Sequence, residues 1–551
     1  MTLGVDLVNS LVPPTASCDS DQLLVQRTDK MSSVEKMKAA TQAYGTQPFN
    51  QLEQVETQHQ GTFRTVELST LGLRQETQRD IGPLDTICVG WNICNSWAGV
   101  AATLALTIAQ GGSVTLIYGV VVCFIMVGCS GLTMGELASV YPTAGGQYHW
   151  TSILAPPKAS RFLSYACGIT NAYAWIATTA GIAIIVPQVI LAMVIHYQPD
   201  YVPQTWHYFL LYQAVNFLVC MHNIFSLKKT MWVNDVSFVV TLTGFVTIIV
   251  TCLARAPTKQ SSEFVWTNFV NESGWPAGIS FLTGLVSPNY MYAGIDGAIH
   301  LAEECKQAEK VVPRALVSTL TIGFITSFMF AVSMTYCITD FDAVLSTPTG
   351  FPIYEIWLQA TRSSTAATIF MAILLTAATV ALIAVQQTAS RLTWSLARDK
   401  ALIWSGFIGH VHPSLQVPVW ALLANNTIVF IIGFIFLGSS TAFNAFIGTG
   451  LILQQATYAI PAALLVYRRR SSMYLPINRP FKLFSPFGWT VNLCTIAFAI
   501  VVLIFYDFPV VIPVSGSNMN YTSAVIGVMA LFAVINWILY AGKSYHGPRL
   551  D

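Results

Sequence analysis

Long apolar runs alternate with short polar segments along most of this chain. From about Pro83 onward, twelve runs are long enough to cross roughly 30 Å of hydrocarbon, which takes about 20 helical residues. Strict alternation of apolar and polar residues is absent, which excludes a membrane β-barrel. The pattern predicts an all-α membrane protein with twelve transmembrane helices, at about 84–109, 113–137, 162–195, 207–226, 231–254, 277–300, 314–337, 365–390, 418–436, 442–466, 487–507 and 522–541.

Composition agrees with this pattern and narrows the function. Of 551 residues, 54% are hydrophobic and only 10% are charged, against roughly 25% charged residues in soluble proteins. The net charge of +1 gives no electrostatic basis for binding nucleic acid. No phosphate-binding loop, catalytic triad or zinc-protease motif occurs, and the His-Val-His at 410–412 lacks further ligands. We therefore expect neither an enzyme nor a metal or cofactor site.

The first eighty residues differ from the rest of the chain. They are rich in Gln, Ser, Thr, Glu and Lys and lack the pattern of a cleaved signal peptide. We expect residues 1–80 to form a disordered cytoplasmic tail, residues 81–541 a twelve-helix membrane domain, and residues 542–551 a short cytoplasmic C-terminal tail. The tail either carries no role or accepts ubiquitin or phosphate from the cell's modifying machinery at Lys30, Lys36, Lys38, Ser32 and Ser33.

Lys and Arg predict the orientation of the chain. Only Arg255, Lys259 and Arg362 fall in the predicted outer loops, and the other basic residues lie in the inner loops and the two ends. Because cytoplasmic loops are enriched in basic residues, both termini are predicted to be cytoplasmic. Two sequons, at Asn271 and Asn520, fall in outer loops and are candidate N-glycosylation sites. The plasma membrane is the expected location.

Two predicted spans carry helix-breaking sequences near their middle. The first span contains WNICNSWAG at 91–99, and the sixth contains SPNYMYAGIDG at 287–297. Broken helices within a membrane are tolerated where they line a cavity, and they form the solute sites of many carriers. Spans one and six each begin a half of five helices, which is typical of an inverted repeat. The alternative is that Gly and Ser here only allow close helix packing.

Asp296 is the most informative single residue in these breaks. A carboxylate at this depth costs about 2.5–3.5 kcal/mol on insertion scales, so it requires a partner or a water-filled cavity. Three roles stay open: attraction of a substrate amine, acceptance of a coupling proton, or capping of the restarted helix. The aromatic residues Trp97, Trp175, Tyr290 and Tyr292 either contact an amine through their rings or only pack. Asn171 either faces the cavity or joins two helices.

Several motifs resemble those of the amino acid–polyamine–organocation (APC) permease superfamily. GELASVYPTAGGQY at 135–148 resembles the loop after the second helix of these permeases. NSWAG at 95–99 and LSYACG at 163–168 resemble the fungal amino acid/choline branch, which includes choline and GABA permeases. Glu303-Glu304 and VVPRA at 311–315 are similar to the segment after helix six. The resemblance covers about residues 81–541.

The resemblance implies a five-plus-five inverted repeat with broken helices 1 and 6, two added helices, and alternating access. In the superfamily, the substrate meets the unwound parts of helices one and six. Carried over, and together with Asn171 and Trp175, this predicts a substrate site at Asn95, Ser96, Trp97, Ala98, Gly99, Tyr290, Tyr292, Ala293, Gly294, Ile295 and Asp296. Some proton-coupled relatives have a lysine in helix five, whereas the span 231–254 of this chain has none.

These observations converge on a transport function. We expect a secondary active transporter that imports a small amine-bearing solute, such as choline or an amino acid like GABA, by proton symport. The alternative is a permease-like nutrient receptor that binds its substrate and signals through the N-terminal tail with little flux.

Overall fold

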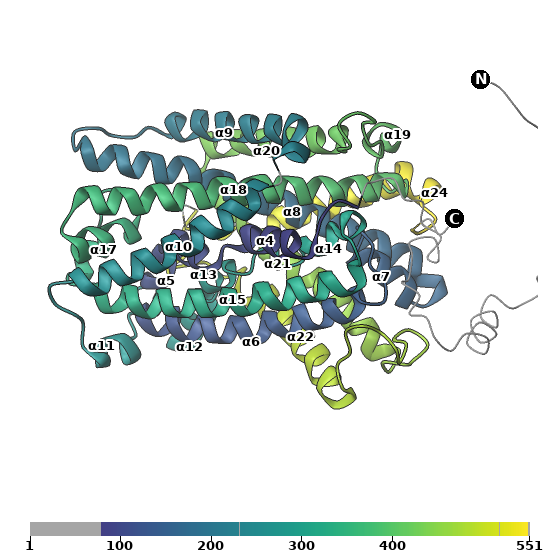
Figure 1. Cartoon of the computed structure of the whole chain (residues 1–551), viewed down its shortest axis with the longest axis horizontal. Coiled ribbons are helices and arrows are strands. Elements are labelled where there is room, and N and C mark those ends of the chain that lie inside the picture. Colours follow the sequence, from purple (N-terminus) through teal and green to yellow (C-terminus); the bar gives the residue numbers. More distant parts are fainter. Residues whose placement is uncertain (1–78, 231, 517, 549–551) are drawn as a thin grey trace, which may run out of the picture. The chain divides into compact units, whose positions relative to one another are not determined.

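The computed structural model describes residues 79–548, except for residues 231 and 517. The predicted tail at 1–80 lies outside this region apart from its last two residues, and so do the modification sites predicted within it. All structural statements below refer to the described residues, and helix labels follow Figure 1.

Ten helices are long and apolar enough to cross a membrane, and they correspond to ten of the twelve predicted spans. This confirms an all-helical, multi-pass membrane protein. Within the described residues, β-structure is limited to two isolated bridges. The ten helices are α6 (Gly112–Ala138), α8 (Pro157–Tyr197), α9 (Thr205–Phe225), α10 (Trp232–Arg255), α15 (Ala308–Cys337), α18 (Ser364–Arg398), α20 (Val419–Gly438), α21 (Ser440–Tyr467), α22 (Ser485–Phe505) and the segment Thr522–Ser544, made of α23 (Thr522–Asn536), the π-helical η4 (Trp537–Ala541) and α24 (Gly542–Ser544).

The other two predicted spans are divided into shorter helices. The first consists of α4 (Pro83–Cys94) and α5 (Ser96–Ala109), which meet at Asn95. The sixth consists of α12 (Ala277–Gly284), α13 (Val286–Tyr290) and α14 (Gly297–His300). Both interruptions fall within the sequences predicted to break these helices.

Short helices connect the long ones at both ends of the bundle. Three of the seven follow an N-cap or proline signal, at Ser261, Asp340 and Pro352. They are α7 (Gln147–Leu154), η2 (Leu227–Lys229), α11 (Ser262–Thr267), η3 (Ala302–Glu304), α16 (Phe341–Leu345), α17 (Pro352–Thr361) and α19 (Ser405–Ile408).

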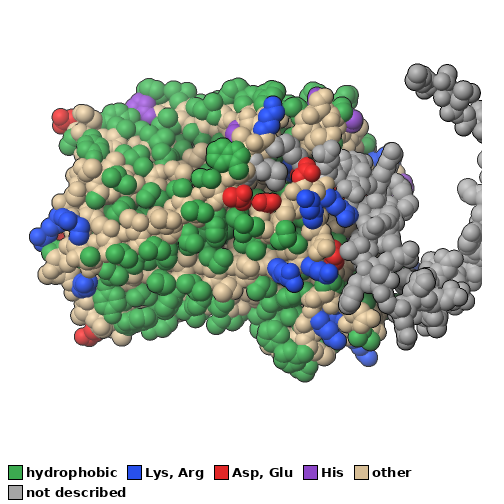
Figure 2. Space-filling model, viewed as in Figure 1, with side chains coloured by type: hydrophobic (Ala, Val, Ile, Leu, Met, Phe, Trp, Pro, Cys, Tyr) green, Lys and Arg blue, Asp and Glu red, His purple; other side chains and the backbone are tan. Residues whose placement is uncertain are grey.

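The divided helices lie inside the bundle. Helix α4 packs against α10, α15 and α18, and α5 packs against α6, α13 and α15. Figure 1 shows them between α18 on one side and α6 and α15 on the other. Helices α9 and α20 pack against each other and present many apolar side chains outward. On the face shown in Figure 2, apolar side chains cover the helices, and most Lys and Arg gather toward the end that carries α7 and α24.

Helix α18 is longer than its sequence predicted. The predicted span ended at residue 390, whereas the helix continues to Arg398. The additional two turns carry Arg391 and Arg398, which form ion pairs with Glu304 and Glu303 of η3. A prediction from hydropathy alone ends the span at the first charged residue. It therefore misses the last turns of a helix when another segment neutralises their charges.

Candidate functional site

The break in the first span is a left-handed turn at Asn95. Its backbone has φ 33° and ψ 61°, a region that asparagine enters more readily than most residues. The Asn95 N–H still donates to the Trp91 carbonyl, at 2.6 Å, and helix α5 restarts at Ser96. The Ser96 hydroxyl donates to the carbonyl oxygen of Met291 at 2.7 Å. The break is therefore held directly against the interrupted sixth span.

The break in the sixth span is a series of tight turns between α13 and α14. Gly294 has φ 77°, and a Cβ at this position would lie 2.8 Å from Cγ2 of Ile93 and 3.1 Å from the Trp175 ring. Its N–H donates to Oε1 of Gln454 at 3.2 Å. Only glycine combines this backbone conformation with such close neighbours. The predicted unwinding at Gly294 thus has a steric reason that the sequence signal did not contain.

A cavity of about 210 Å³ lies beside the two breaks. Among the described residues that line it, none is acidic or basic; the polar members are Asn95, Thr103, Thr178, Gln188, Tyr290 and Asn444. The apolar remainder comes from both broken spans and from helices α8, α18 and α21. Mostly apolar walls with a few polar groups are typical of small-molecule sites, and the volume suits a solute smaller than a drug molecule.

Asn95 is the unusual member of this lining. Its side chain is only 3% exposed, and within the described part of the chain neither Oδ1 nor Nδ2 has a hydrogen-bond partner. A buried polar group without a partner costs about 1–3 kcal/mol. Since the same side chain borders the cavity, a ligand there has one donor and one acceptor available to it.

The structure divides the predicted site residues into two groups. One group lines the cavity: Asn95, Ala98, Gly99, Tyr290 and Ala293. The other is not among the lining residues and is buried elsewhere: Ser96, Trp97, Asn171, Trp175, Tyr292, Gly294, Ile295 and Asp296. For example, the Trp97 ring packs against Phe245 and Phe330. Its bulk therefore serves helix packing in this structure.

Four polar lining residues were missed from the sequence: Thr103, Thr178, Gln188 and Asn444. Thr178 lies seven residues after Asn171 on helix α8, which places it on the same helix face, so this periodicity could have found it. Gln188 and Asn444 are exposed side chains nearer the ends of α8 and α21. They lie in otherwise apolar segments, but nothing in their local sequence indicates that the two helices meet at one cavity.

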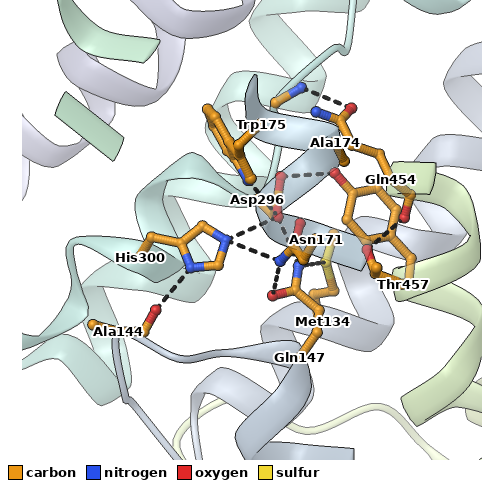
Figure 3. Close-up of polar contacts among 12 residues, drawn as sticks. Met134, Ala144, Gln147, Asn171, Ala174, Trp175, Asp296, His300, Gln454 and Thr457 are labelled. Carbon is orange, nitrogen blue, oxygen red and sulfur yellow. Dashed lines mark hydrogen bonds and ion pairs between the residues drawn. The ribbon is translucent and has the colours of Figure 1, made fainter. Parts of the chain in front are cut away.

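Asp296 lies at the centre of a separate, buried polar cluster (Figure 3). Its Oδ2 is 2.7 Å from Nε2 of Gln147, 3.3 Å from Nε1 of Trp175 and 3.0 Å from Nε2 of His300. Its Oδ1 accepts from the Tyr458 hydroxyl at 2.7 Å. No hydrogen bond runs from the carboxylate to a backbone N–H of α14, so the capping alternative is not observed. Both carboxylate oxygens are occupied by protein groups.

A further set of contacts ties this cluster to the loop that follows α6. Nδ2 of Asn171 donates to Oε1 of Gln147 at 3.2 Å, which orients the Gln147 amide toward Asp296. Nδ1 of His300 lies 2.8 Å from the carbonyl oxygen of Ala144. Figure 3 shows Ala144 and Gln147 on the side of the cluster where the motif at 135–148 passes. The motif therefore supplies both an orienting amide and a backbone acceptor.

Buried ion pairs continue from this cluster toward the basic end of the bundle. Glu303 forms a two-pronged pair with Arg398, at 2.8 and 3.1 Å, and accepts from the Ala144 N–H. Burial opposes ionisation of Glu303, but this pairing outweighs it, so the pKa of Glu303 is lowered. Glu304 pairs with Arg391 at 2.7 Å. These contacts join η3, α18 and the loop after α6.

Glu136, at the end of α6, anchors the other side of the same loop. Its two oxygens pair with Arg470 at 2.6 Å and Arg479 at 2.7 Å, and Oε1 also accepts from the Leu483 N–H. The carboxylate is fully buried. This explains structurally why the motif carries a glutamate, as its second residue, at the end of an apolar helix.

Comparison with known proteins identifies the family. The amino acid permease family model matches residues 81–531. The chain belongs to this family. It is 34% identical over 461 residues, 83% of this chain and 81% of the other, to a choline transporter of Saccharomyces cerevisiae. It is also 32% identical to a swainsonine transporter of Arthroderma benhamiae, over 86% of this chain and 93% of that one.

A third similar protein widens the range of solutes within the family. The 7-keto 8-aminopelargonic acid transporter of Saccharomyces cerevisiae is 26% identical, over 82% of this chain and 90% of that protein. Family membership confirms the predicted resemblance and makes this permease a membrane transporter of small molecules rather than an enzyme.

Proposed function

We propose that this permease is a secondary active transporter that imports a small amine-bearing solute through the cavity beside Asn95. The observation that carries the proposal is the pair of unpartnered, buried polar atoms on Asn95 at the border of that cavity. A solute that hydrogen-bonds both atoms removes the cost of leaving them unsatisfied.

The two divided spans support an alternating-access architecture. Counted as the first and sixth of twelve transmembrane helices, α4–α5 and α12–α14 each begin a half of five helices, and two further helices follow. In such carriers the halves rock about the broken helices, and the solute site lies between them. The proposed orientation places both termini in the cytoplasm of a cell whose plasma membrane contains the permease.

The state described here is best explained as outward-facing. The exposed lining residues Gln188 and Asn444 lie toward the predicted outer ends of α8 and α21. The ion pairs of Glu303, Glu304 and Glu136 lie on segments predicted to be cytoplasmic. We propose that these pairs hold the inner end closed while the cavity receives solute from outside.

We propose choline or an amino acid such as GABA as the substrate, and the chemistry of the lining supports this choice. Neutral polar groups suit a zwitterion, whose own charges balance, and the Tyr290 ring is available to a quaternary ammonium group. The similarity to a choline transporter favours choline. Polyamines, with several uncompensated positive charges, do not fit walls without a carboxylate.

The test is uptake of labelled choline and GABA by cells that lack their own carriers for these solutes. Competition by polyamines and neutral amino acids at two external pH values identifies the substrate and the coupling ion. We expect saturable uptake that rises at acidic external pH and falls in Asn95→Gly at equal surface expression. Surface binding without uptake, together with signalling lost on removal of residues 1–80, would instead indicate a nutrient receptor.

A further inference from the structure

Each ring nitrogen of His300 lies close to a hydrogen-bond acceptor, and Nε2 also lies 3.4 Å from the amide donor Nδ2 of Asn171. Nδ1 lies 2.8 Å from the Ala144 carbonyl oxygen, and Nε2 lies 3.0 Å from Oδ2 of Asp296. A carbonyl oxygen only accepts, so the hydrogen of a neutral imidazole must be on Nδ1. Nε2 would then present a lone pair to a carboxylate oxygen. The 3.0 Å contact with Asp296 is shorter than the 3.4 Å contact with the Asn171 donor, and it therefore indicates one additional proton between Nε2 and Asp296.

The other contacts of Asp296 decide where that proton is held. Gln147, Trp175 and Tyr458 all donate to the carboxylate. Three donors in a buried site stabilise the ionised carboxylate, so the proton belongs on the ring. The Trp175 ring also contacts the imidazole edge-on, with centroids 5.7 Å apart. We propose that His300, as an imidazolium paired with Asp296, is the site that carries the coupling proton of this permease.

The titratable side chains around this pair come from α4, α21 and η3 in the part of the chain that the structure describes. Facing titratable side chains are Cys94 of α4 and Tyr458 of α21. From η3, Glu303 accepts from the Ala144 N–H and is paired with Arg398 of α18, while Glu304 is paired with Arg391 of α18. Among the described residues, the charged side chains of α15 form no hydrogen bond or ion pair with His300 or Asp296.

Loss of the proton would act on both ends of the transport path. When the Nε2 proton leaves to water at the inner side, Nδ1 keeps its hydrogen and its bond to Ala144. The Nε2 lone pair and the carboxylate then repel each other. This repulsion would move His300, at the end of α14, away from Asp296, the residue that precedes the helix. Asp296 is three residues from Ala293 of the cavity lining, and Ala144 also binds Glu303. The protonation state is thereby linked to the cavity and to the inner ion pairs.

This inference rests on the proposed proton-driven import. The experiment therefore distinguishes failure of the assignment to His300 from failure of the proposed proton drive. Purified full-length wild-type permease and His300→Gln are reconstituted into vesicles. Two quantities are measured: counterflow of labelled solute with no pH gradient, and proton entry that accompanies uptake. His222→Gln is the matched control, because His222 lies on α9 and its Nε2 contacts only the Thr230 hydroxyl among the described residues.

We expect His300→Gln to keep counterflow but to lose proton entry and uphill accumulation. For one proton per solute, a gradient of one pH unit supports about tenfold accumulation, which should fall to none in His300→Gln and persist in His222→Gln. Proton entry unchanged in His300→Gln would overturn the assignment to His300 alone. Wild-type transport without proton entry would overturn this inference together with the proposed drive.

A second measurement needs neither transport nor a stable His300 variant. Nitrogen-15 NMR of histidine-labelled protein distinguishes doubly protonated from neutral rings. At about pH 8, solvated histidines are neutral, and His149, the other buried histidine paired with an aspartate, is removed by His149→Gln. We expect one doubly protonated ring to remain in that protein. If every ring is neutral, the proton is not held at His300 and the inference fails.

Discussion

The two broken spans use their polar groups in opposite ways. At the first break, Asn95 is buried beside a cavity, and both of its side-chain polar atoms lack a partner in the described residues. At the second break, Asp296 is fully buried, and four side chains contact its carboxylate. The sequence placed both residues in one predicted substrate site, since each is a polar residue within an interrupted apolar helix.

The difference in hydrogen bonding between Asn95 and Asp296 indicates that one break serves solute binding and the other serves protein stability. Unsatisfied groups destabilise the empty protein but are available to a ligand, whereas a saturated carboxylate stabilises the fold and has no free acceptor for a solute. We infer that the first break recognises the solute, while the second holds the unwound segment and its proton. Variants at the first break should therefore lower solute affinity more than stability, and variants at the second break should lower stability more than affinity.

The largest effect is expected from filling the second break. In Gly294→Leu, the new side chain meets Ile93 and Trp175 at a backbone conformation with φ 77°. The conformation costs about 1–2 kcal/mol for a residue with a Cβ, and overpacking adds about 1–3 kcal/mol. We expect no measurable uptake and a lower melting temperature.

Gly278→Leu is the control for Gly294→Leu, because a Cβ at Gly278 of α12 meets no atom within 4 Å. It should retain wild-type uptake and stability. Full activity of Gly294→Leu would show that the segment does not need its unwound form.

Asp296→Asn should lower stability before it changes selectivity. The substitution replaces an acceptor of four contacts by an amide and leaves His300 without its carboxylate, and breaking a buried charged pair costs about 3–5 kcal/mol. We expect a clear drop in melting temperature and loss of uptake for every substrate alike. Competition assays on the residual binding test this. Selective loss of cationic substrates would instead show that Asp296 reaches the solute.

Asn95→Gly should have the reverse profile. Glycine accepts the left-handed conformation and removes an amide that has no partner in the described residues, so unfolding stability should change by no more than about 1 kcal/mol. Loss of hydrogen bonds to the solute should raise KM about tenfold. Uptake kinetics and melting temperature are compared in the same preparations.

Asn92→Ala gives the matched comparison on the same helix. Asn92 is buried, and its Nδ2 donates to the Asn234 carbonyl at 2.8 Å, outside the cavity lining. This variant should lose stability with an unchanged KM. If Asn95→Gly behaves like Asn92→Ala, Asn95 is a packing residue and the comparison of the two breaks fails.

The sequence predicted the helices and the positions of both breaks because those depend on local properties. Apolar length specifies a span, and asparagine, proline and glycine mark where a helix is interrupted. The predicted residues that line the cavity all belong to these interrupted segments. Local signals thus indicated two short stretches of chain that border the cavity.

The partners of Asp296 could not be predicted in this way. Gln147 and Tyr458 reach it from α7 and α21, which are distant in sequence, and His300 showed no signal beyond lying four residues after Asp296. The sequence also could not decide whether Asp296 faces a solute or the protein. That choice depends on how helices far apart in the chain pack around one carboxylate.

The smallest expected effect concerns how protein stability changes at acidic pH because of the ion pair between Glu303 and Arg398. Like Asp296, Glu303 is a buried carboxylate whose contacts are made by the protein itself. Although burial opposes its ionisation, Glu303 has a pKa lowered from its ordinary value of 4.5 by Arg398 and the Ala144 N–H. Because the folded-state pKa lies below the unfolded one, this group stabilises the protein above about pH 4.5, and the contribution disappears as pH falls through the folded value.

Melting temperatures of wild type and Glu303→Gln between neutral and acidic pH measure this contribution. The variant should start lower at neutral pH, because Arg398 loses its carboxylate partner, and should lose less on acidification. The exposed Glu263→Gln on α11 is the control and should follow the wild-type curve. Parallel curves for wild type and Glu303→Gln would mean that this ion pair adds nothing to stability. In that case stabilisation by a buried, fully paired carboxylate would be limited to Asp296 and its immediate contacts.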